Sequence, residues 1–420
     1  MDCNLTVSTT LAMRGKTLRS NRNGIRLRPL SMQIKTARRH SKTFIEDCQK
    51  SKSGSQSLQN LKSLKPAKSM SSSSSPDSEN IIDLHGKNLQ KIEKITTEQR
   101  PSVLDLSCNN IEKIENLKNL ESIKELKLYG NKILVVENLD KLRELQYLKL
   151  QHNQLKSFGS GLNCPSLHTL RVDYNNLTEI KSSQLAGCPN LRSLNVSSNN
   201  LKILSFVKVL PDLEELAASG NQLSNLSDIS TCLCLRELDI SDNRLSDISG
   251  ISDLASLQTL NLSGNSLKDI KNAGKHPKLT DLQIQGNKLT ETEDICVQFP
   301  NLEVLNISFN LLDSWTEVIN LQSLASLTEL TVKCNSFVHQ YKFYHADVVK
   351  EIPSLQWLDG INVKENKKTL NNSNIRQASA YAGAVGNDLN KELESLDLSP
   401  EIINDITERF VKLRSSISKL

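Results

Sequence analysis

An alternation of leucines and polar residues runs through most of this chain, as Leu-x-x-Leu-x-Leu-x-x-Asn-x-Leu or a close variant. The segment from Leu145 to Leu155, LQYLKLQHNQL, is one example. Leucines at every second position predict a short β-strand with one buried and one exposed face. The asparagine predicts a turn off that strand, because its amide can satisfy backbone groups that the turn leaves unpaired.

The asparagine of this pattern recurs eleven times, and seven of the ten gaps between successive copies are 22 residues. A fixed period of this size indicates stacked repeats that each contact only their neighbours. We therefore predict an α/β fold: a curved solenoid with a parallel β-sheet on its concave face. A hydrogen-bonded column of asparagines would run through it, formed by Asn109, Asn131, Asn153, Asn175, Asn199, Asn221, Asn243, Asn265, Asn287, Asn310 and Asn335.

The segments between each asparagine and the next strand carry apolar residues at every third position, as in Ile111, Ile114, Leu117 and Leu120. This spacing favours short 3₁₀ or irregular segments on the convex side over full α-helices. Three longer gaps between asparagines should bulge there. Near the end of the pattern, we expect a helix from about His345, and then a last strand, to cover the open end of the core.

The pattern divides the chain into four parts. The first is a Ser-rich basic tail with few apolar residues, which we expect to be disordered. The last carries apolar residues at alternating spacings of three and four, which predicts a helix with a short coiled-coil rhythm. In chain order the parts are the tail (1–80), a solenoid of about 12 repeats (81–363, including a cap at 337–363), a linker (364–388) and a C-terminal helical segment (389–420).

Charge is distributed unevenly along the chain. Residues 1–80 carry fifteen Lys/Arg against five Asp/Glu, a net charge of +10, whereas the whole chain carries +5. Such a tail can contact an acidic protein surface, nucleic acid or anionic lipid, and we do not expect nucleic acid to be the main partner. Within it, Ser31 and Ser41 follow arginines at spacings typical of basophilic kinase substrates, so both are candidate phosphorylation sites.

Cysteine usage and hydropathy bear on localisation. The nine cysteines are scattered without metal-ligand spacing, and Cys108, Cys164 and Cys188 are expected to be small buried thiols. No stretch approaches the roughly 20 apolar residues of a membrane span. We expect a reducing compartment and a cytoplasmic location. Nuclear localisation, or organelle import directed by the basic tail, are the alternatives.

The 22-residue period, the convex pattern from Ile111 to Leu120 and the ending Tyr-x-x-x-Val…Pro-Ser-Leu…Leu-Asp at 344–359 resemble one known family. It is the phosphatase-regulator-like subclass of intracellular leucine-rich repeat proteins, which have a C-terminal cap. The resemblance implies a non-enzymatic protein-binding scaffold or adaptor, in a cytoskeletal or ciliary setting. The alternative function that it implies is a regulatory subunit of a Ser/Thr protein phosphatase, with the catalytic subunit as partner.

The concave face is where the partner is expected. The residues between the two strand leucines should stack from repeat to repeat, about 5 Å apart. This column contains no aromatic residue, so it does not reproduce the phosphatase surface implied by the resemblance. An ordinary hydrated face is the other interpretation. The candidate partner-binding residues are a basic group with two flanking tyrosines (Lys127, Lys149, Arg171, Tyr129, Tyr147) and an acidic group (Glu215, Glu237, Asp239).

Catalytic and cofactor-binding motifs are missing from the sequence. We find no nucleotide-binding glycine fingerprint, no P-loop, no His-Glu-x-x-His and no nucleophile elbow. The sequence therefore predicts no enzymatic activity, no cofactor and no metal site.

Overall fold

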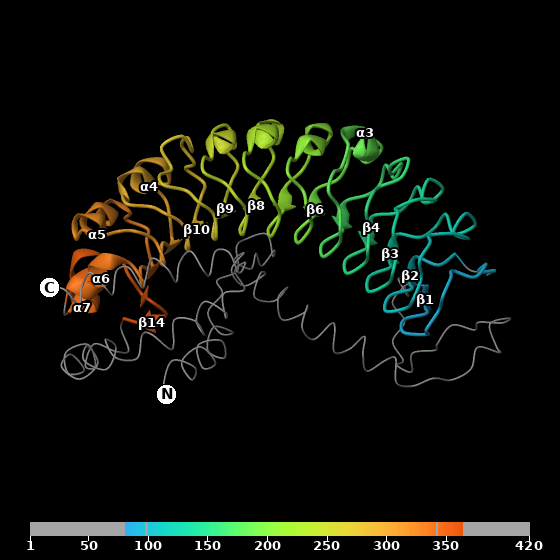
Figure 1. Cartoon of the computed structure of the whole chain (residues 1–420), viewed down its shortest axis with the longest axis horizontal. Coiled ribbons are helices and arrows are strands. Elements are labelled where there is room, and N and C mark those ends of the chain that lie inside the picture. Colours follow the sequence, from blue (N-terminus) through green and yellow to red (C-terminus); the bar gives the residue numbers. More distant parts are fainter. Residues whose placement is uncertain (1–79, 97–99, 342, 364–420) are drawn as a thin grey trace, which may run out of the picture.

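The computed structural model describes residues 80–96, 100–341 and 343–363. The basic tail with Ser31 and Ser41, the linker 364–388 and the segment 389–420 lie outside the described residues. The described chain forms one arc with strands along its inner edge and short helices along its outer edge (Figure 1). The predicted fold class, a curved solenoid built on a parallel sheet, is confirmed.

Within the described part of the chain, fourteen short strands form a single sheet in chain order. All neighbouring pairs are parallel except the last, β13 and β14, which is antiparallel. The register is set by the central leucines: Leu126, Leu148 and Leu170 face one another on adjacent strands and are buried. The strands are β1 Ile81–Asp83, β2 Val103–Asp105, β3 Glu125–Lys127, β4 Tyr147–Lys149, β5 Thr169–Arg171, β6 Ser193–Asn195, β7 Glu215–Ala217, β8 Glu237–Asp239, β9 Thr259–Asn261, β10 Asp281–Gln283, β11 Val304–Asn306, β12 Glu329–Thr331, β13 Trp357–Leu358 and β14 Ile361–Asn362.

The secondary structure on the outer edge of the arc differs between the 22-residue repeats and the longer ones. Of the seven 22-residue repeats, three carry 3₁₀ turns, η2 Ser205–Val209, η3 Ser227–Thr231 and η4 Ser249–Ile251, and the other four have irregular convex segments, as expected from the apolar spacing. The three longer gaps between asparagines contain α-helices instead: α3 Ser182–Leu185, α4 Glu293–Gln298 and α5 Thr316–Asn320, the last continued by η5 Leu321–Ser323. The extra residues give the wider path that an α-helical turn needs.

The core is one continuous apolar layer between the two edges of the arc. Strand leucines line its concave side, and apolar residues of the convex segments close it from outside. Phe158, Phe206, Phe299 and Phe337 are fully buried within it. Cys164, Cys188 and Cys232 are buried free thiols, whereas Cys108, expected to be another, is disulfide-bonded.

The asparagine column is present as predicted. Asn131 is typical: its amide nitrogen donates to the carbonyls of Leu106 and Leu128, both at 3.0 Å. Its Oδ1 accepts the N–H of Ile111, also at 3.0 Å. Each asparagine therefore joins two successive repeats, and all eleven are at most 8% exposed. These bonds satisfy backbone groups that would otherwise be buried without partners.

The C-terminal end of the arc is covered by α6 Ser336–Gln340, by α7 Tyr344–Glu351 and by the β13–β14 hairpin. Asp359 connects these elements. Its Oδ1 accepts the N–H groups of Val332 and Lys333, at 2.9 and 3.1 Å. Its Oδ2 accepts the Tyr344 hydroxyl at 2.5 Å and lies 3.4 Å from His345 Nε2. Burial raises the pKa of Asp359, but these hydrogen bonds outweigh burial and lower it overall.

Asp359→Asn should loosen this end of the solenoid. Because the pKa of Asp359 is lowered, its carboxylate stabilises the fold above the unfolded pKa, about 3.9, and this contribution is lost as pH falls through the folded pKa. We expect the variant to lose about 2–3 kcal/mol of local stability at neutral pH. Hydrogen exchange of α7 at pH 7 and at about pH 3.5 measures this. The exposed Asp313→Asn is the control; equal protection of α7 in both variants at pH 7 would contradict the prediction.

Candidate partner-binding surface

The concave surface consists of the outward side chains of the strands and of the residues just after them. Lys127, Lys149 and Arg171 occupy equivalent positions on β3, β4 and β5, and the sheet register pairs them directly. The structure therefore brings together the three basic residues singled out in the sequence.

Each of these three cations has a carboxylate partner, so the group is not a bare positive column. Lys127 Nζ lies 3.5 Å from Asp105 Oδ2, and Lys149 Nζ lies 2.6 Å from Glu125 Oε1. Both pairs join neighbouring strands, which places the acid and the base about one strand spacing apart. Asp105 shares the outward column of Lys127, whereas Glu125 lies in the neighbouring column. Sequence reasoning predicted the stacking of the basic residues but neither ion pair.

Arg171 is paired within its own repeat. Its guanidinium donates to both carboxylate oxygens of Asp173, at 3.1 and 2.8 Å. Burial alone lowers the pKa of Arg171, but Asp173 more than compensates and raises it. A bidentate pair of this kind fixes both side chains in one orientation. Arg171 and Asp173 thus form a rigid polar element of the concave face.

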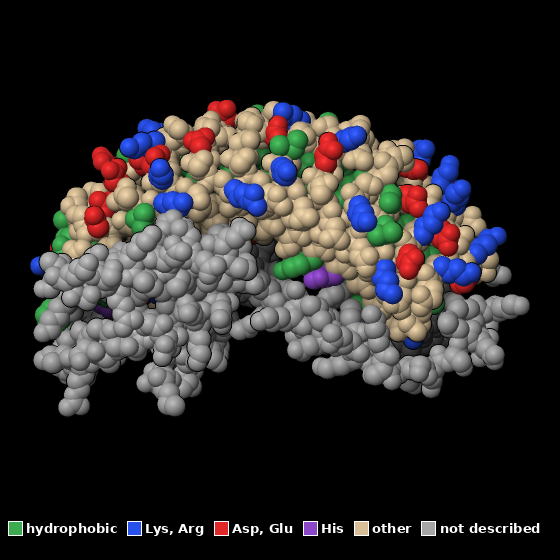
Figure 2. Space-filling model, in the orientation of Figure 1, with side chains coloured by type: hydrophobic (Ala, Val, Ile, Leu, Met, Phe, Trp, Pro, Cys, Tyr) green, Lys and Arg blue, Asp and Glu red, His purple; other side chains and the backbone are tan. Residues whose placement is uncertain are grey.

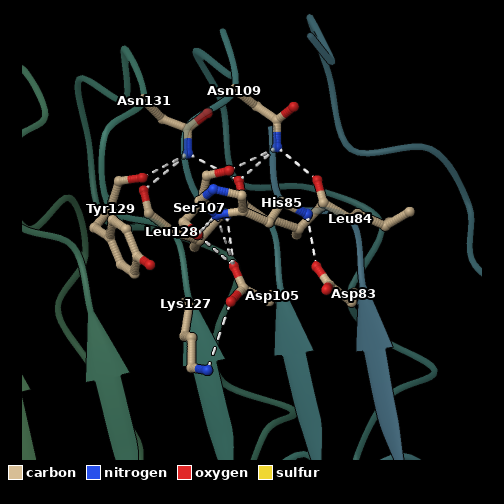
Figure 3. A network of polar contacts seen from close by, with 11 residues as sticks. Asp83, Leu84, His85, Asp105, Ser107, Asn109, Lys127, Leu128, Tyr129 and Asn131 are labelled. Carbon is tan, nitrogen blue, oxygen red and sulfur yellow. Dashed lines mark hydrogen bonds and ion pairs between the residues drawn. The ribbon is translucent and has the colours of Figure 1, made fainter. Parts of the chain in front are cut away.

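A second polar network lies at the first strands of the arc (Figure 3). Asp105 accepts the N–H of Ser107 at 3.0 Å and also its hydroxyl, while His85 Nδ1 lies 2.7 Å from that hydroxyl oxygen. These are the residue types of a hydrolytic triad, but Ser107 is fully buried and directs its proton to Asp105. A nucleophilic serine needs the base next to its hydroxyl proton and access to substrate. We interpret this network as structural.

Aromatic side chains stand on both sides of the basic residues. Tyr147 is 44% exposed on β4, and Tyr129 follows β3, its ring 6.5 Å from that of His85. The sequence analysis missed a second pair: the rings of His152 and Tyr174 stack at 4.5 Å. Burial lowers the pKa of His152, partly offset by Asp173. The signal was available, since both residues directly precede a ladder asparagine.

His152 and Tyr174 adopt left-handed backbone conformations, with φ of 55° and 54°. Gly130 and Gly220 occupy the equivalent position in other repeats, also at positive φ. Non-glycine residues in this region cost roughly 1 kcal/mol or more each. The two rings are therefore held at the edge of the concave face at some cost in backbone strain.

The acidic group lies further along the sheet, on β7 and β8. Glu215 and Glu237 are directly paired on β7 and β8. Asp239 points outward beside them but is 6% exposed and accepts both the N–H and the hydroxyl of Ser241. Glu214 directly precedes β7. Its carboxylate lies between two guanidinium groups, with Oε1 3.6 Å from Arg192 Nη1 and Oε2 3.4 Å from Arg236 Nη1.

Two carboxyls of this region have strongly raised pKa values. Burial, and then the charges of Glu215 and Asp281, raise the pKa of Glu237 to about 7. Burial raises that of Asp281 to about 6, and the hydrogen bond from Gln283 limits the increase. Asp281 belongs to the same outward column as Glu215 and Glu237 but was not named in the sequence analysis, because Thr259 separates it from them in that column.

Within residues 80–96, 100–341 and 343–363, no cluster of His, Cys, Asp or Glu could hold a metal ion, and no helix is long and apolar enough to cross a membrane. Acidic and basic side chains are interspersed over the visible outer surface (Figure 2). The partner-binding role of the eight concave residues named from the sequence stays a prediction.

Comparison with known proteins gives the same fold. A family model described as "Leucine rich repeat" matches residues 102–155 and again 165–223, and a second model, described as "Leucine Rich repeats (2 copies)", matches residues 235–275. No curated protein matches the chain.

Two solved structures have the same architecture as this chain. An internalin from Listeria monocytogenes has a TM-score of 0.50 and 21% identity, covering 68% of this chain and 88% of that one. A chain from a complex of latrophilin 3, Unc5D and the leucine-rich repeats of FLRT2 has a TM-score of 0.55 and 21% identity, covering 64% and 87%. At this identity the similarity extends to the fold alone. On its repeats, its ladder and these matches, the chain is a leucine-rich repeat protein.

Proposed function

We propose that this protein is a non-enzymatic scaffold that binds a protein partner on its concave face, mainly across β3–β5. Leucine-rich repeat domains generally mediate protein–protein interaction, and the FLRT2 repeats to which this arc is similar were solved within a multi-protein complex. The proposal extends that general role to a particular surface of this chain.

The observation that carries the proposal is the pairing of exposed rings with fixed charges. Tyr147 and Tyr174 are 44% and 38% exposed, and both lie beside charges that are oriented by ion pairs. Tyrosine and arginine are enriched at protein interfaces, where a ring supplies contact area at low entropic cost. Oriented side chains reduce the ordering cost of binding further.

A photo-crosslinking experiment tests this surface directly. Tyr147 is replaced with a photoreactive phenylalanine derivative in the full chain, and captured proteins are identified by mass spectrometry. The control position is Val297, which is 56% exposed on α4 at the outer edge of the arc. We expect position 147 to capture a recurrent partner several-fold more strongly than position 297.

Charge reversal provides the second arm. Lys149→Glu should abolish capture from position 147, because it breaks the pair with Glu125 and reverses the charge on the concave face. Lys208→Glu is the matched control, since Lys208 makes a comparable pair with Asp228 at 2.7 Å on the convex η2 turn. Identical captured proteins at positions 147 and 297, or equal effects of the two reversals, would refute a concave binding site.

The proposal also includes a cellular setting and one candidate partner. A cytoskeletal or ciliary setting, a cytoplasmic location and a phosphatase catalytic subunit as partner rest on the resemblance described above. Identification of the protein captured at position 147 tests each of them.

A further inference from the structure

Three carboxylates form a row across the concave face on β7–β10. The row consists of Glu215, Glu237 and Asp281, which share one outward column, with Thr259 of β9 between the last two. At about 4.8 Å per strand, the row spans roughly 14 Å. We refer to these three residues as the acidic row.

The acidic row differs from the charges on β3–β5 in having no cationic partner. None of the ion pairs found among the described residues includes a member of the row, whereas Lys127, Lys149 and Arg171 are each paired. The nearest arginines along the chain, Arg192 and Arg236, both contact Glu214 instead.

Asp281 adds an independent indication that a donor belongs here. It is 5% exposed, and its Oδ1 accepts the side-chain amide of Gln283 at 2.7 Å. Its Oδ2 is buried and has no hydrogen-bond partner. A buried carboxylate oxygen without a donor is costly, so such atoms call for an explanation such as a ligand that supplies one.

We propose that the acidic row binds an extended Lys/Arg-rich segment of a protein partner. This inference rests on the proposed concave binding function and adds the chemistry of one partner segment. An extended chain advances about 3.3 Å per residue, so four or five residues match the length of the row. Lysine and arginine heads donate hydrogen bonds to carboxylates and would supply a donor to Asp281 Oδ2.

Binding to the acidic row should depend on pH, because two of its carboxyls have raised pKa values. The groups facing Glu237 are Glu215 from β7, Thr259 from β9 and Asp281 from β10, with Arg236 and Asp239 on its own strand segment. Burial together with the charges of Glu215 and Asp281 raises the pKa of Glu237 to about 7. Asp281 faces Glu329 of β12 as well, and burial together with the charge of Glu329 raises its pKa to about 6 against the hydrogen bond from Gln283. A bound cation favours the ionised carboxylates, so binding releases protons, and affinity should rise as pH increases through this range.

The test is calorimetric titration of the full chain with a ten-residue peptide of alternating Lys and Ser, at about 50 mM salt to limit screening. The matched peptide has Glu in place of Lys. We expect the Lys peptide to bind at pH 8, to bind about tenfold more weakly at pH 5.5, and to release protons near pH 6.5. The Glu peptide should not bind.

Substitutions in the acidic row test whether peptide binding and its pH dependence come from these carboxyls. The double variant Glu237→Gln with Asp281→Asn should weaken binding at least about tenfold at pH 8 and flatten the pH dependence. Glu293→Gln, an exposed change on the convex α4, is the control for a lost negative charge. Thermal melts at both pH values confirm that the variants are folded.

Three outcomes would overturn the inference: absence of Lys-peptide binding, pH-independent binding, or unchanged binding by the double variant. A photoreactive group at position 237 that cross-links to residues 1–79 of the same chain would replace the partner with the chain's own basic tail, and would also overturn it. Capture from position 147 is measured separately. If that capture persists while the peptide fails, the concave scaffold proposal stands and only the acidic row loses its role.

Discussion

Asn221→Ala should lower the free energy of unfolding of the solenoid by about 2–6 kcal/mol, because it leaves the buried N–H of Leu201 without a partner, at about 1–3 kcal/mol, and removes two further hydrogen bonds, at about 0.5–1.5 kcal/mol each. The two carbonyls involved, those of Val196 and Ala218, each keep one donor, from Asn199 and Asn243 respectively. In the intact chain, Asn221 accepts the N–H of Leu201 at 3.0 Å and donates to the carbonyls of Val196 and Ala218, at 3.1 and 3.0 Å. The residue itself is 8% exposed, so water cannot readily replace these bonds.

Chemical denaturation of the full chain measures the effect. Asn301→Ala is the matched control: Asn301 also donates across repeats, to the carbonyl of Pro277 at 2.8 Å, but it is exposed. We expect that variant to change stability by less than about 1 kcal/mol. Asn221 lies near the middle of the stack, so its loss should also increase hydrogen exchange in the two repeats that it joins. A change for Asn221→Ala no larger than the control would show that the ladder contributes little.

The ladder could be predicted from the sequence because one residue type, at one period, performs one local task. An asparagine three residues after the second strand leucine reaches backbone groups of its own and the preceding repeat, whatever the other side chains are. The short 3₁₀ turns followed in the same way from apolar residues three apart. The α-helices of the longer repeats were not predicted as helices, because the sequence showed extra length without showing how the chain would use it.

The polar surface was predicted less well, for a geometric reason. The register of β3–β5 follows from the repeat, so the stacking of Lys127 on Lys149 could be foreseen. The two ion pairs could not be foreseen: Glu125 reaches Lys149 from the neighbouring outward column, and Asp105, although it shares the column of Lys127, could have been oriented in several ways. Such contacts depend on rotamers and on the curvature of the sheet, which the period does not specify. Asp281 was missed for a related reason, since its unpartnered oxygen is visible only once its surroundings are built.

Close packing between convex turns is another feature that the period alone does not reveal. Gly250 lies in η4, and its backbone approaches the preceding repeat at Leu226. A Cβ added to Gly250 would lie 2.1 Å from the Leu226 carbonyl oxygen and 2.3 Å from its carbonyl carbon. These are backbone atoms, so a change of rotamer cannot relieve the overlap. The two turns would have to separate, which opens the apolar layer beneath them.

Gly250→Ala should therefore destabilise the solenoid by about 3 kcal/mol or more, at or above the upper end of the usual range for overpacking. The gain expected when alanine replaces glycine in a helical turn, up to about 1 kcal/mol, is too small to offset it. Ser252→Ala, an exposed change two residues further along, is the control and should be nearly neutral. Denaturation midpoints of the two variants decide the matter. If Gly250→Ala were neutral, the spacing between the η3 and η4 turns would be adjustable, and the stiffness that makes the concave face a preorganised surface would have to come from the strands and the asparagine ladder alone.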